Sequence, residues 1–492
     1  MRKQLIPIIL LIAILSGCNS VSTVNPSDDT DLYEDTLTAT DTLTETDISL
    51  PDAVDYAGET ITVLSRLVTG HYCYPYHEFI VTEESGDIIN DAILKRNRAV
   101  EEKYNVVFEA FEEDDVGAVA QKSILAGDSV YDILLPMHAS AYQMSVQGVL
   151  SNMADLPHID KSRPYWHTSI MNNTSIGEKN YFLTGDLNLS TLNGVGVVYF
   201  NQGVADKYDI PDLYDIVRDG KWTLDGMTMY GRTVTRDLNG DQNMNGDDMY
   251  GLTCNGFVWQ PLFAGTGSSI ISKDDSDYPV LEWGSNKNIE RIAKLVEFLN
   301  DHQSVILVNQ FPELQDAGGW GNASIKMFSE DRALFWIEII YGIHQLRDMD
   351  TDFGLLPIPQ YDEMQEEYTS YIHTSWTSTV CVPITNQDLD RTGRILEDLA
   401  YQSHKLVRPA YYDVTLKDKI SRDEDSGQML DILYSNINLD LALVISTLPI
   451  DGTMRSFVID NKTDFASKIE SLTDKCEKVI QSNLDTFSGL ES

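Results

Sequence analysis

Alternating stretches of apolar and polar residues predict strands and helices in turn from about Gly58 onward. The β-branched run Thr60–Leu64 is typical of a strand, and residues 87–104 after it place apolar positions close to helical spacing with charged residues on the other face. The same alternation continues with strands at 106–108 and 131–135 and helices at 117–125 and after Pro136. Strands that alternate with helices over short connections favour parallel pairing, which predicts an α/β domain.

A second block repeats this alternation. Strand-like runs occupy 195–200, 251–253, 333–336 and 353–357, and the chain from Arg391 onward is mostly helical, with its clearest apolar faces at 395–400 and 429–433. Ligands of such sheets bind beyond the carboxyl ends of the strands. Ser65 and Arg66, which end the first strand, are therefore expected to point toward a site.

The first residues have the pattern of an export signal. Arg2 and Lys3 precede an almost wholly apolar run from Leu5 to Leu15, which is too short to span a bilayer about 30 Å thick. The next residues, Leu15-Ser16-Gly17-Cys18, resemble the lipobox of bacterial lipoproteins, in which the cysteine becomes the lipid-bearing N-terminus. We expect a signal peptide at 1–17 and lipidation at Cys18, and a cysteine that follows an ordinary signal by chance is the alternative.

Residues 18–57 are expected to form a disordered tether. This stretch is rich in Thr, Ser, Asp and Glu and has no basic residue. It cannot bury enough apolar surface to offset the entropy of ordering. A flexible coil of about forty residues reaches roughly 30 to 40 Å, so the folded part can stand away from the membrane.

The charge balance restricts the possible partners. With 77 acidic and 35 basic side chains the chain carries a net charge of -42, which disfavours nucleic acid and anionic lipid headgroups. A hydrophobic fraction of 42% indicates a folded core of two lobes rather than a disordered chain. Four of the five cysteines are widely spaced, which predicts isolated thiols rather than disulfides.

A set of motifs resembles one family along nearly the whole chain. The motifs are Asp219-Gly-Lys-Trp-Thr223, Asp237-Leu-Asn-Gly-Asp241, Asp248-Met-Tyr-Gly-Leu252, Tyr181-Phe-Leu-Thr-Gly-Asp186 and Phe353-Gly-Leu-Leu-Pro357. Together with further matches from Arg96-Asn97 to Met429-Leu-Asp431, and taken in chain order, they are similar to extracellular solute-binding proteins of carbohydrate ABC importers. The resemblance implies a two-lobed α/β fold of the periplasmic-binding-protein type (type II), with the ligand between the lobes and hinge closure on binding.

The resemblance also implies a division of the chain. Lobe 1 is expected to comprise 58–186 and about 376–425, and lobe 2 is expected to comprise 187–375 and about 426–492. The chain would cross between the lobes near Thr184–Asn193 and return near His373–Val382.

Residues 237–248 fit a twelve-residue calcium loop. Oxygen ligands at alternate positions are what Ca²⁺ requires, and they are supplied by Asp237, Asn239, Asp241, the carbonyl of Asn243, Asn245 and Asp248. Gln242 stands where glycine is usual, and Asp248 is shorter than the usual glutamate. A register that starts at Asp241 ends on Leu252, which cannot ligate, and a solvated turn without metal is the alternative. Related importer proteins carry comparable loops in a structural role.

Sugar sites combine flat aromatic rings with carboxylates, amides and arginine. The residues with such side chains at strand ends or at the two crossings are Ser65, Arg66, Asp186, Asn193, Asn255, Trp259, Trp336, Glu338 and Trp376. Each also has a simpler interpretation: Trp336 lies in an apolar run that is typical of a core, and Trp259 could cap a helix. Losing Trp259 or Trp376 is expected to weaken sugar binding ten-fold or more.

The sequence predicts a binding protein and not an enzyme. No nucleophile elbow, zinc-protease helix or phosphate-binding loop is present, and paired carboxylates carry little information in so acidic a chain. We expect a monomeric lipoprotein on the extracytoplasmic face of the cell membrane, which captures a mono- or oligosaccharide and delivers it to ABC permease subunits. A membrane-anchored glycan hydrolase and a calcium-dependent surface adhesion module are the alternatives.

Overall fold

The computed structural model describes residues 49–67, 76–315, 320–415 and 424–489, of which those from Pro51 onward form one compact unit. The predicted signal peptide, the lipidation site Cys18 and most of the predicted tether lie outside the described residues, as does Cys73. The predicted domain boundaries stay predictions.

A three-stranded parallel sheet forms the first lobe. Its strand order is β2 (Val106–Glu113), β1 (Glu59–Arg66) and β3 (Ile133–Leu134), so the expected parallel pairing is confirmed here. The helices that pack on this sheet or on one another beside it are α1 (Ile88–Tyr104), α2 (Val116–Leu125), α3 (His138–Val146), α14 (Leu389–Gln402) and α15 (Arg408–Thr415). Helix α1 begins at Asp87, whose side chain accepts from the Asn90 amide as an N-cap.

A five-stranded mixed sheet forms the second lobe. Its order is β10 (Phe353–Leu356), β4 (Gly196–Asn201), β9 (Ala333–Ile339), β5 (Tyr250–Cys254) and β8 (Val305–Leu307). Strands β9, β5 and β8 are parallel to one another, whereas β4 runs antiparallel to both of its neighbours. The four strands predicted for this block are confirmed, and β8 is an addition that the sequence pattern did not identify.

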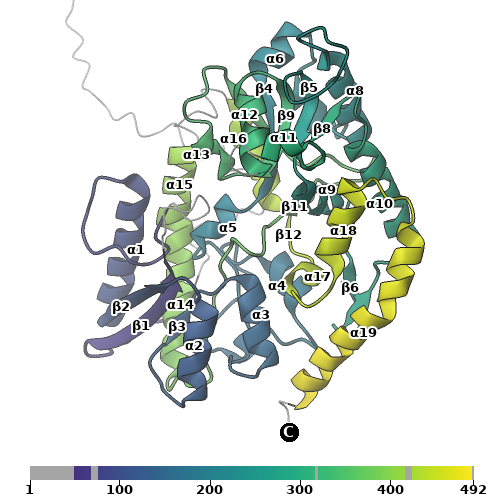
Figure 1. The fold of residues 1–492 in the computed structure, drawn as a ribbon. Coiled ribbons are helices and arrows are strands. Elements are labelled where there is room, and N and C mark those ends of the chain that lie inside the picture. The colour runs from purple at the N-terminus through teal and green to yellow at the C-terminus, as the bar shows by residue number, and fades with distance from the viewer. Residues whose placement is uncertain (1–48, 68–75, 316–319, 416–423, 490–492) are drawn as a thin grey trace, which may run out of the picture. The chain divides into compact units, whose positions relative to one another are not determined.

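Further elements surround the second sheet (Figure 1). The helices are α6 (Gln202–Lys207), α7 (Leu213–Arg218), α8 (Leu224–Val234), α9 (Trp259–Gly265), α10 (Asn286–Leu299), α11 (Pro312–Gln315), α12 (Trp320–Ser329), α13 (Gly342–Gln345) and α16 (Glu424–Ser435). Two small sheets pair β6 (Ile271–Lys273) with β7 (Pro279–Leu281) and β11 (Ser370–Tyr371) with β12 (Ile437–Asn438).

The elements that remain connect the lobes or close the chain. Short helices α4 (Thr168–Thr174) and α5 (Leu189–Asn193) lie before the second sheet. The chain ends with α17 (Leu441–Val444), α18 (Ile450–Ile459) and the 25-residue α19 (Phe465–Gly489). We call residues 437–489, from β12 to the end of α19, the C-terminal segment.

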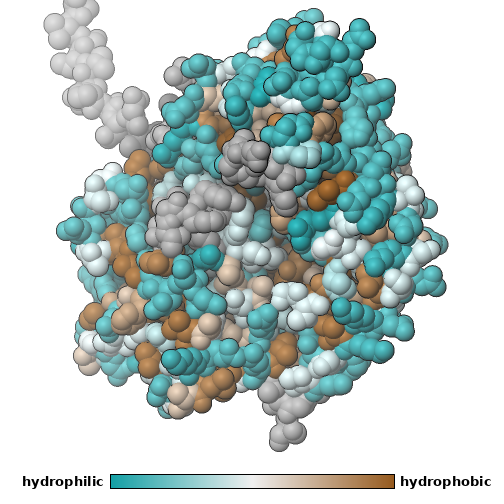
Figure 2. Space-filling view, in the orientation of Figure 1, coloured by the Kyte–Doolittle hydropathy of each residue, from teal (hydrophilic) through white to brown (hydrophobic). Residues whose placement is uncertain are grey.

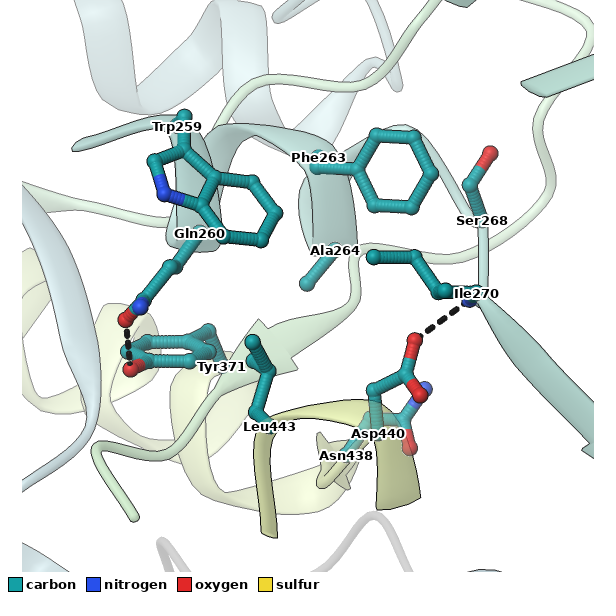
Figure 3. Close-up of a pocket in the computed structure, with 10 residues that line it drawn as sticks. All are labelled: Trp259, Gln260, Phe263, Ala264, Ser268, Ile270, Tyr371, Asn438, Asp440 and Leu443. Atoms are coloured by element: carbon teal, nitrogen blue, oxygen red, sulfur yellow. Dashed lines mark hydrogen bonds between the residues drawn. The ribbon is translucent and has the colours of Figure 1, made fainter. Parts of the chain in front are cut away.

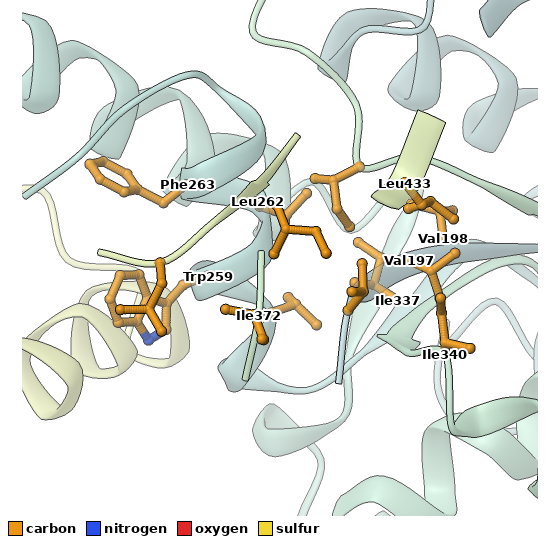
Figure 4. Close-up of a cluster of buried hydrophobic side chains, with 14 of the residues drawn as sticks. Val197, Val198, Trp259, Leu262, Phe263, Ile337, Ile340, Ile372 and Leu433 are labelled. Carbon is orange, nitrogen blue, oxygen red and sulfur yellow. The ribbon is translucent and has the colours of Figure 1, made fainter. Parts of the chain in front are cut away.

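The core of the second lobe lies between its sheet and the helices that cover it. Figure 4 shows Val197, Val198 and Ile337 of the sheet facing side chains from α9 and α16, among them Leu262 and Leu433. Burying such aliphatic side chains contributes about 1.5 to 3 kcal/mol each, which fixes the sheet against its helices.

Within the described residues, no helix is both long and apolar enough to cross a membrane. Figure 2 shows that hydrophilic side chains cover most of the visible surface near α6 and α8, as expected from the acidic composition.

Candidate functional site

Two antiparallel segments join the lobes and define where a site can form. Leu183 pairs with Val380 at the first lobe, and Val195 pairs with Ile372 at the second. Between these pairs the segments touch closely, because a Cβ on Gly194 would lie 2.2 Å from the Thr377 methyl group. Residues 183–195 and 372–380 are called the crossing segments below.

A polar network holds the crossing segments together. Asn188 donates to Ser378 at 3.0 Å, and the buried Glu78 carboxylate of the first lobe accepts from Ser190 Oγ and Ser378 Oγ, each at 2.6 Å. The crossing is therefore a fixed junction, since breaking any of these bonds would leave a buried polar group unsatisfied.

Residues from separate elements meet where the crossing segments reach the second sheet. The Asn193 carbonyl accepts from the Tyr341 amide at 3.1 Å, and its side-chain oxygen accepts from the Tyr411 hydroxyl at 2.8 Å. The His373 amide donates to the Gly194 carbonyl at 3.0 Å, and the His373 ring stacks on Trp376 with centroids 4.2 Å apart and planes 8° apart. The predicted residues Asn193 and Trp376 thus both lie at this crossing, with Asn193 bonded to Tyr411 and Trp376 stacked on His373.

Glu338 supplies a carboxylate to the same region. It lies near the end of β9, opposite Val197 of β4, and is half-buried. Its Oε1 accepts from the adjacent Ile339 amide at 3.1 Å, and burial raises its pKa to about 7. A partly accessible carboxylate with a raised pKa is typical of a functional site rather than of a structural ion pair.

Aromatic rings from both lobes approach each other beyond the end of β9, the strand that carries this carboxylate. Tyr341 and His344 of the second lobe have ring centroids 5.1 Å apart, and Tyr76 of the first lobe meets His344 edge-on at 5.9 Å. We call Asn193, Glu338, Tyr341, His373, Trp376 and Tyr411, together with Tyr76 and His344, the crossing cluster. Sequence reasoning missed five of its members; that Tyr341 and His344 directly follow a strand was the signal available for two of them.

The structure places Ser65 and Arg66 on the first-lobe side of the crossing. Ser65 is fully buried and its hydroxyl donates to the Phe111 carbonyl at 3.3 Å. The Arg66 guanidinium contacts Met137, which pairs with Ser378 of the second crossing segment. Arg66 therefore lies close to the crossing, whereas Ser65 is packed within the sheet.

Asp186 is not at the surface but inside a charged cluster. It is 2% exposed, and its Oδ2 accepts from His404 Nδ1 at 2.5 Å and from Arg408 Nη1 at 3.3 Å. Burial alone would raise the pKa of Asp186, but Arg408 and His404 outweigh it and hold the pKa at about 2. A π-helix at Ser403–Val407 brings His404 to this position. Asp186 thus anchors the helices beside the crossing and presents no free surface to a ligand.

Asn255 and Trp259 lie beyond the end of β5, and Trp259 borders the crossing through Tyr371, which lines the same pocket and whose ring lies 6.1 Å from that of His373. The Asn255 side chain caps the following turn by accepting from the Phe257 amide at 2.9 Å. Trp259 is 1% exposed and donates its indole N–H to Asp451 at 3.1 Å. It lines a small pocket, shown in Figure 3, together with Gln260, Phe263, Ala264, Ser268, Ile270, Tyr371, Asn438, Asp440 and Leu443.

Trp336 belongs to the core of the second lobe. It is 2% exposed and packs against Tyr199 and Phe328, with ring centroids 4.9 and 5.9 Å away. The core interpretation of its apolar run is the one that the structure supports. Glu338 lies two residues further along β9 on the same face, and it is less buried because it is nearer the end of the strand.

The loop at 237–248 is organised by its own side chains. Asp237 accepts from the amides of Gly240 and Gln242, and Asn239 and Asp241 each accept from the amide two residues ahead. Gln242 has a φ of +64°, so it adopts the left-handed conformation for which glycine is usual at this position. Asp248 is fully buried and accepts from the amides of Leu238 and Asn245, both at 2.9 Å.

No protein-family model and no curated protein matches the sequence. Solved structures do. A cyclo/maltodextrin-binding protein complexed with maltotetraose superimposes with a TM-score of 0.54 at 10% identity, over 88% of this chain and 97% of the other. The GacH receptor of Streptomyces glaucescens gives a TM-score of 0.52 at 12% identity, over 86% and 99% of the two chains.

The chain has the two-lobed fold of solute-binding proteins. This confirms the fold class predicted from the sequence. UgpB from Mycobacterium tuberculosis, in complex with glycerophosphocholine, shares the fold with a TM-score of 0.52 at 14% identity, over 80% of this chain and 95% of the other. These three relatives are binding proteins or receptors, and the crossing cluster lies where the two lobes of this solute-binding fold join.

Proposed function

We propose that this protein captures a carbohydrate at the crossing cluster and delivers it to the permease subunits of an ABC importer. The ligand is bound and released without chemical change. The proposal rests on the fold together with the side chains that the two lobes bring to the crossing.

The observation that carries the proposal is the combination of Glu338 with flat aromatic rings. Trp376 supplies an indole face that stacks on His373, and burial lowers the pKa of His373 to about 4, so its ring is neutral at physiological pH. The cluster thus offers aromatic faces, among them the Tyr341 ring, and a carboxylate that accepts hydrogen bonds from hydroxyl groups. Sugars have weakly polar ring faces bordered by hydroxyl groups. The aromatic rings suit the ring faces, and the carboxylate suits the hydroxyl groups.

The ligands named for the similar structures are of two chemical kinds, sugars and a phosphodiester. The GacH receptor was solved with acarbose and the maltodextrin-binding protein with maltotetraose, whereas UgpB was solved with glycerophosphocholine. The phosphodiester group of glycerophosphocholine would be repelled by an ionised Glu338, so we favour a sugar at this site.

A panel of sugars with a phosphodiester included tests the proposal. Thermal-shift screening of the mature protein, followed by calorimetry on the hits, should identify a sugar that binds with micromolar affinity or better. That sugar should be recovered unchanged after prolonged incubation. Binding of glycerophosphocholine alone, or cleavage of the bound sugar, would contradict the proposal.

We also propose that Ca²⁺ stabilises the loop at 237–248 in a structural role. The fit rests on the oxygen-rich donor set and on Gln242, whose left-handed conformation allows the sharp turn of a calcium loop. Asn239 and Asp241 are exposed and Asp237 is half-buried; these three would hold the ion, with the Asn243 carbonyl, Asn245 and Asp248 completing the predicted set. Among the described residues, no group of three or more His, Cys, Asp or Glu side chains has metal-binding geometry, so the asparagine oxygens are essential to this proposal.

Calcium binding is measured by adding chelator or Ca²⁺ to the purified protein. The melting temperature should fall with chelator and recover with Ca²⁺, and Asp237→Asn should reduce this response. An unchanged melting temperature and no heat of binding would leave the loop as a metal-free turn.

We further propose that the mature chain is a monomeric lipoprotein, acylated at Cys18, on the extracytoplasmic face of the membrane. The apolar run before Leu-Ser-Gly-Cys supports this proposal. In detergent phase partitioning, the wild type should enter the detergent phase, whereas the Cys18→Ser variant should stay in the aqueous phase. Intact-mass analysis of the wild type should show the acyl chains. A wild type found only in the aqueous phase would contradict the lipid anchor.

A further inference from the structure

The C-terminal segment lies along the edge of the second sheet at which ligands bind in this type of fold. Strands β9, β5 and β8 are parallel, so their carboxyl ends lie at the same edge, and β4 enters the sheet there from the first crossing segment. Ligands of open α/β sheets bind at such an edge. The part of the edge that remains accessible therefore limits the size of the ligand.

Helix α18 covers the ends of β5 and β8. Gly256, two residues after β5, faces Ile459 so closely that a Cβ on this glycine would lie 2.8 Å from the Ile459 side chain. After β8, the Gln310 side-chain amide donates to the Ile459 carbonyl at 3.0 Å, and before β8 the Asn300 side chain donates to the Val458 carbonyl at 3.0 Å. These two side chains are thus bonded to α18.

The start of α9 is held under the same helix. Trp259 and Gln260 both donate to Asp451 of α18, at 3.1 and 3.0 Å. Arg455 of α18 lies over the Phe257 ring, 4.7 Å from its centroid. Trp259 is therefore an internal contact between α9 and α18 and has no face to offer a sugar.

The other side of the C-terminal segment contacts the first lobe. Ser169 of α4 donates to the Ile437 carbonyl at 2.6 Å, Gln143 of α3 donates to Ser446 at 2.8 Å, and α17 packs on α3. In Figure 1, α17 and α18 lie between the strands of the second lobe and helices α3 and α4 of the first. The segment thus occupies the space between the lobes beside β5 and β8.

At the end of β9, by contrast, Glu338 keeps part of its surface accessible next to the crossing segments. Neighbouring strands lie about 4.8 Å apart, so covering two of them removes about 10 Å of the edge. Beyond β10, Gly265 of α9 packs against Ile358, which confines the accessible part from the other side.

We propose that the C-terminal segment restricts the ligand to a short sugar, a mono- or disaccharide bound between Glu338 and Trp376, and excludes longer oligosaccharides. This inference rests on the proposed carbohydrate function and adds a limit on chain length. The test is calorimetry with homologous series of one to four units, glucose to maltotetraose and mannose to β-1,4-mannotetraose, together with galactose, xylose and fructose series of the same lengths.

The expected result is that affinity reaches its maximum at one or two units and changes less than about two-fold with each further unit. A gain of ten-fold or more on adding the third unit would overturn the length limit while leaving the carbohydrate function intact. Binding of no member of any series would overturn the carbohydrate function itself, and the length limit with it.

Two matched variants and hydrogen exchange locate the bound sugar. Trp376→Ala should weaken the affinity about ten-fold, whereas Trp259→Ala should lower the melting temperature and leave the affinity of the remaining folded protein within about two-fold. With the best-binding sugar present, amides near Asn193 and Tyr341 should gain protection from exchange. Gained protection at residues 255–260 and 307–310 instead would show that the sugar extends over β5 and β8, and would refute the proposal.

Discussion

The substitution Glu338→Gln tests whether burial controls the charge at the crossing cluster. The pKa of Glu338 is about 7 in the folded protein, against an ordinary value of 4.5, because burial disfavours the ionised form. The folded protein therefore holds this proton more tightly than the unfolded chain does. The resulting contribution to stability is complete below pH 4.5 and is lost as the pH rises through about 7.

The size of the effect follows from the same two values. One pKa unit corresponds to about 1.4 kcal/mol, so the interval between 4.5 and about 7 amounts to about 3 kcal/mol. Glutamine has nearly the same shape and no titrating proton. Between pH 4.5 and pH 8 the wild type should therefore lose about 3 kcal/mol of unfolding free energy more than the Glu338→Gln variant does.

Urea unfolding at several pH values measures this difference directly. Subtracting the two proteins at each pH removes the contributions of all other titrating groups. A bound sugar that donates hydroxyl hydrogen bonds to Glu338 favours the carboxylate, so wild-type affinity should rise from pH 5 to pH 8 and proton release should appear in calorimetry near pH 6. Parallel stability profiles for the two proteins, with a sugar affinity that does not depend on pH, would refute the reasoning.

Two further substitutions test how the lobes are held. Phe487 of α19 stacks on Tyr181 of the first lobe at 5.4 Å, so Phe487→Ala should enlarge the radius of gyration of the sugar-free protein in X-ray scattering. Phe465→Ala removes an equal ring that packs within the second lobe and should not change it, and equal radii for both variants would contradict this view. Asp186→Asn leaves Arg408 without its buried partner and should lower the unfolding free energy at pH 7 by about 3 to 5 kcal/mol, as measured with urea; a loss below about 1 kcal/mol would show that the ion pair is not stabilising.

Local patterns were sufficient to predict most of the strands and helices. The β-branched run at Thr60–Leu64 and the capped helix after Asp87 appear in the structure as β1 and α1. Both depend on residues close in sequence: β1 on the alternation of its side chains between two faces, and α1 on its N-cap. The α/β class could be inferred because such elements alternate along the chain, whereas the two-lobed arrangement was implied by the family resemblance.

The candidate site was harder to predict because it depends on which surfaces the chain covers later. Trp259 was expected at a strand end and Trp376 at the return crossing, yet α18 buries Trp259 whereas Trp376 stays partly exposed. The periodicity of α18 identifies an apolar face but not the strand ends against which it packs. Tyr411 was missed for the same reason, since its bond to Asn193 joins residues 218 positions apart in sequence.

The last helix also has a consequence for the order of folding. The Asn483 side chain of α19 donates to the Tyr142 hydroxyl, across a sequence separation of 341 residues. The surface of the first lobe around Tyr142 therefore stays uncovered until almost the entire chain is available. Contacts so distant in sequence slow folding, because a long loop must close before they form. A chain that is exported before it folds would complete its first lobe only after its final residues had crossed the membrane.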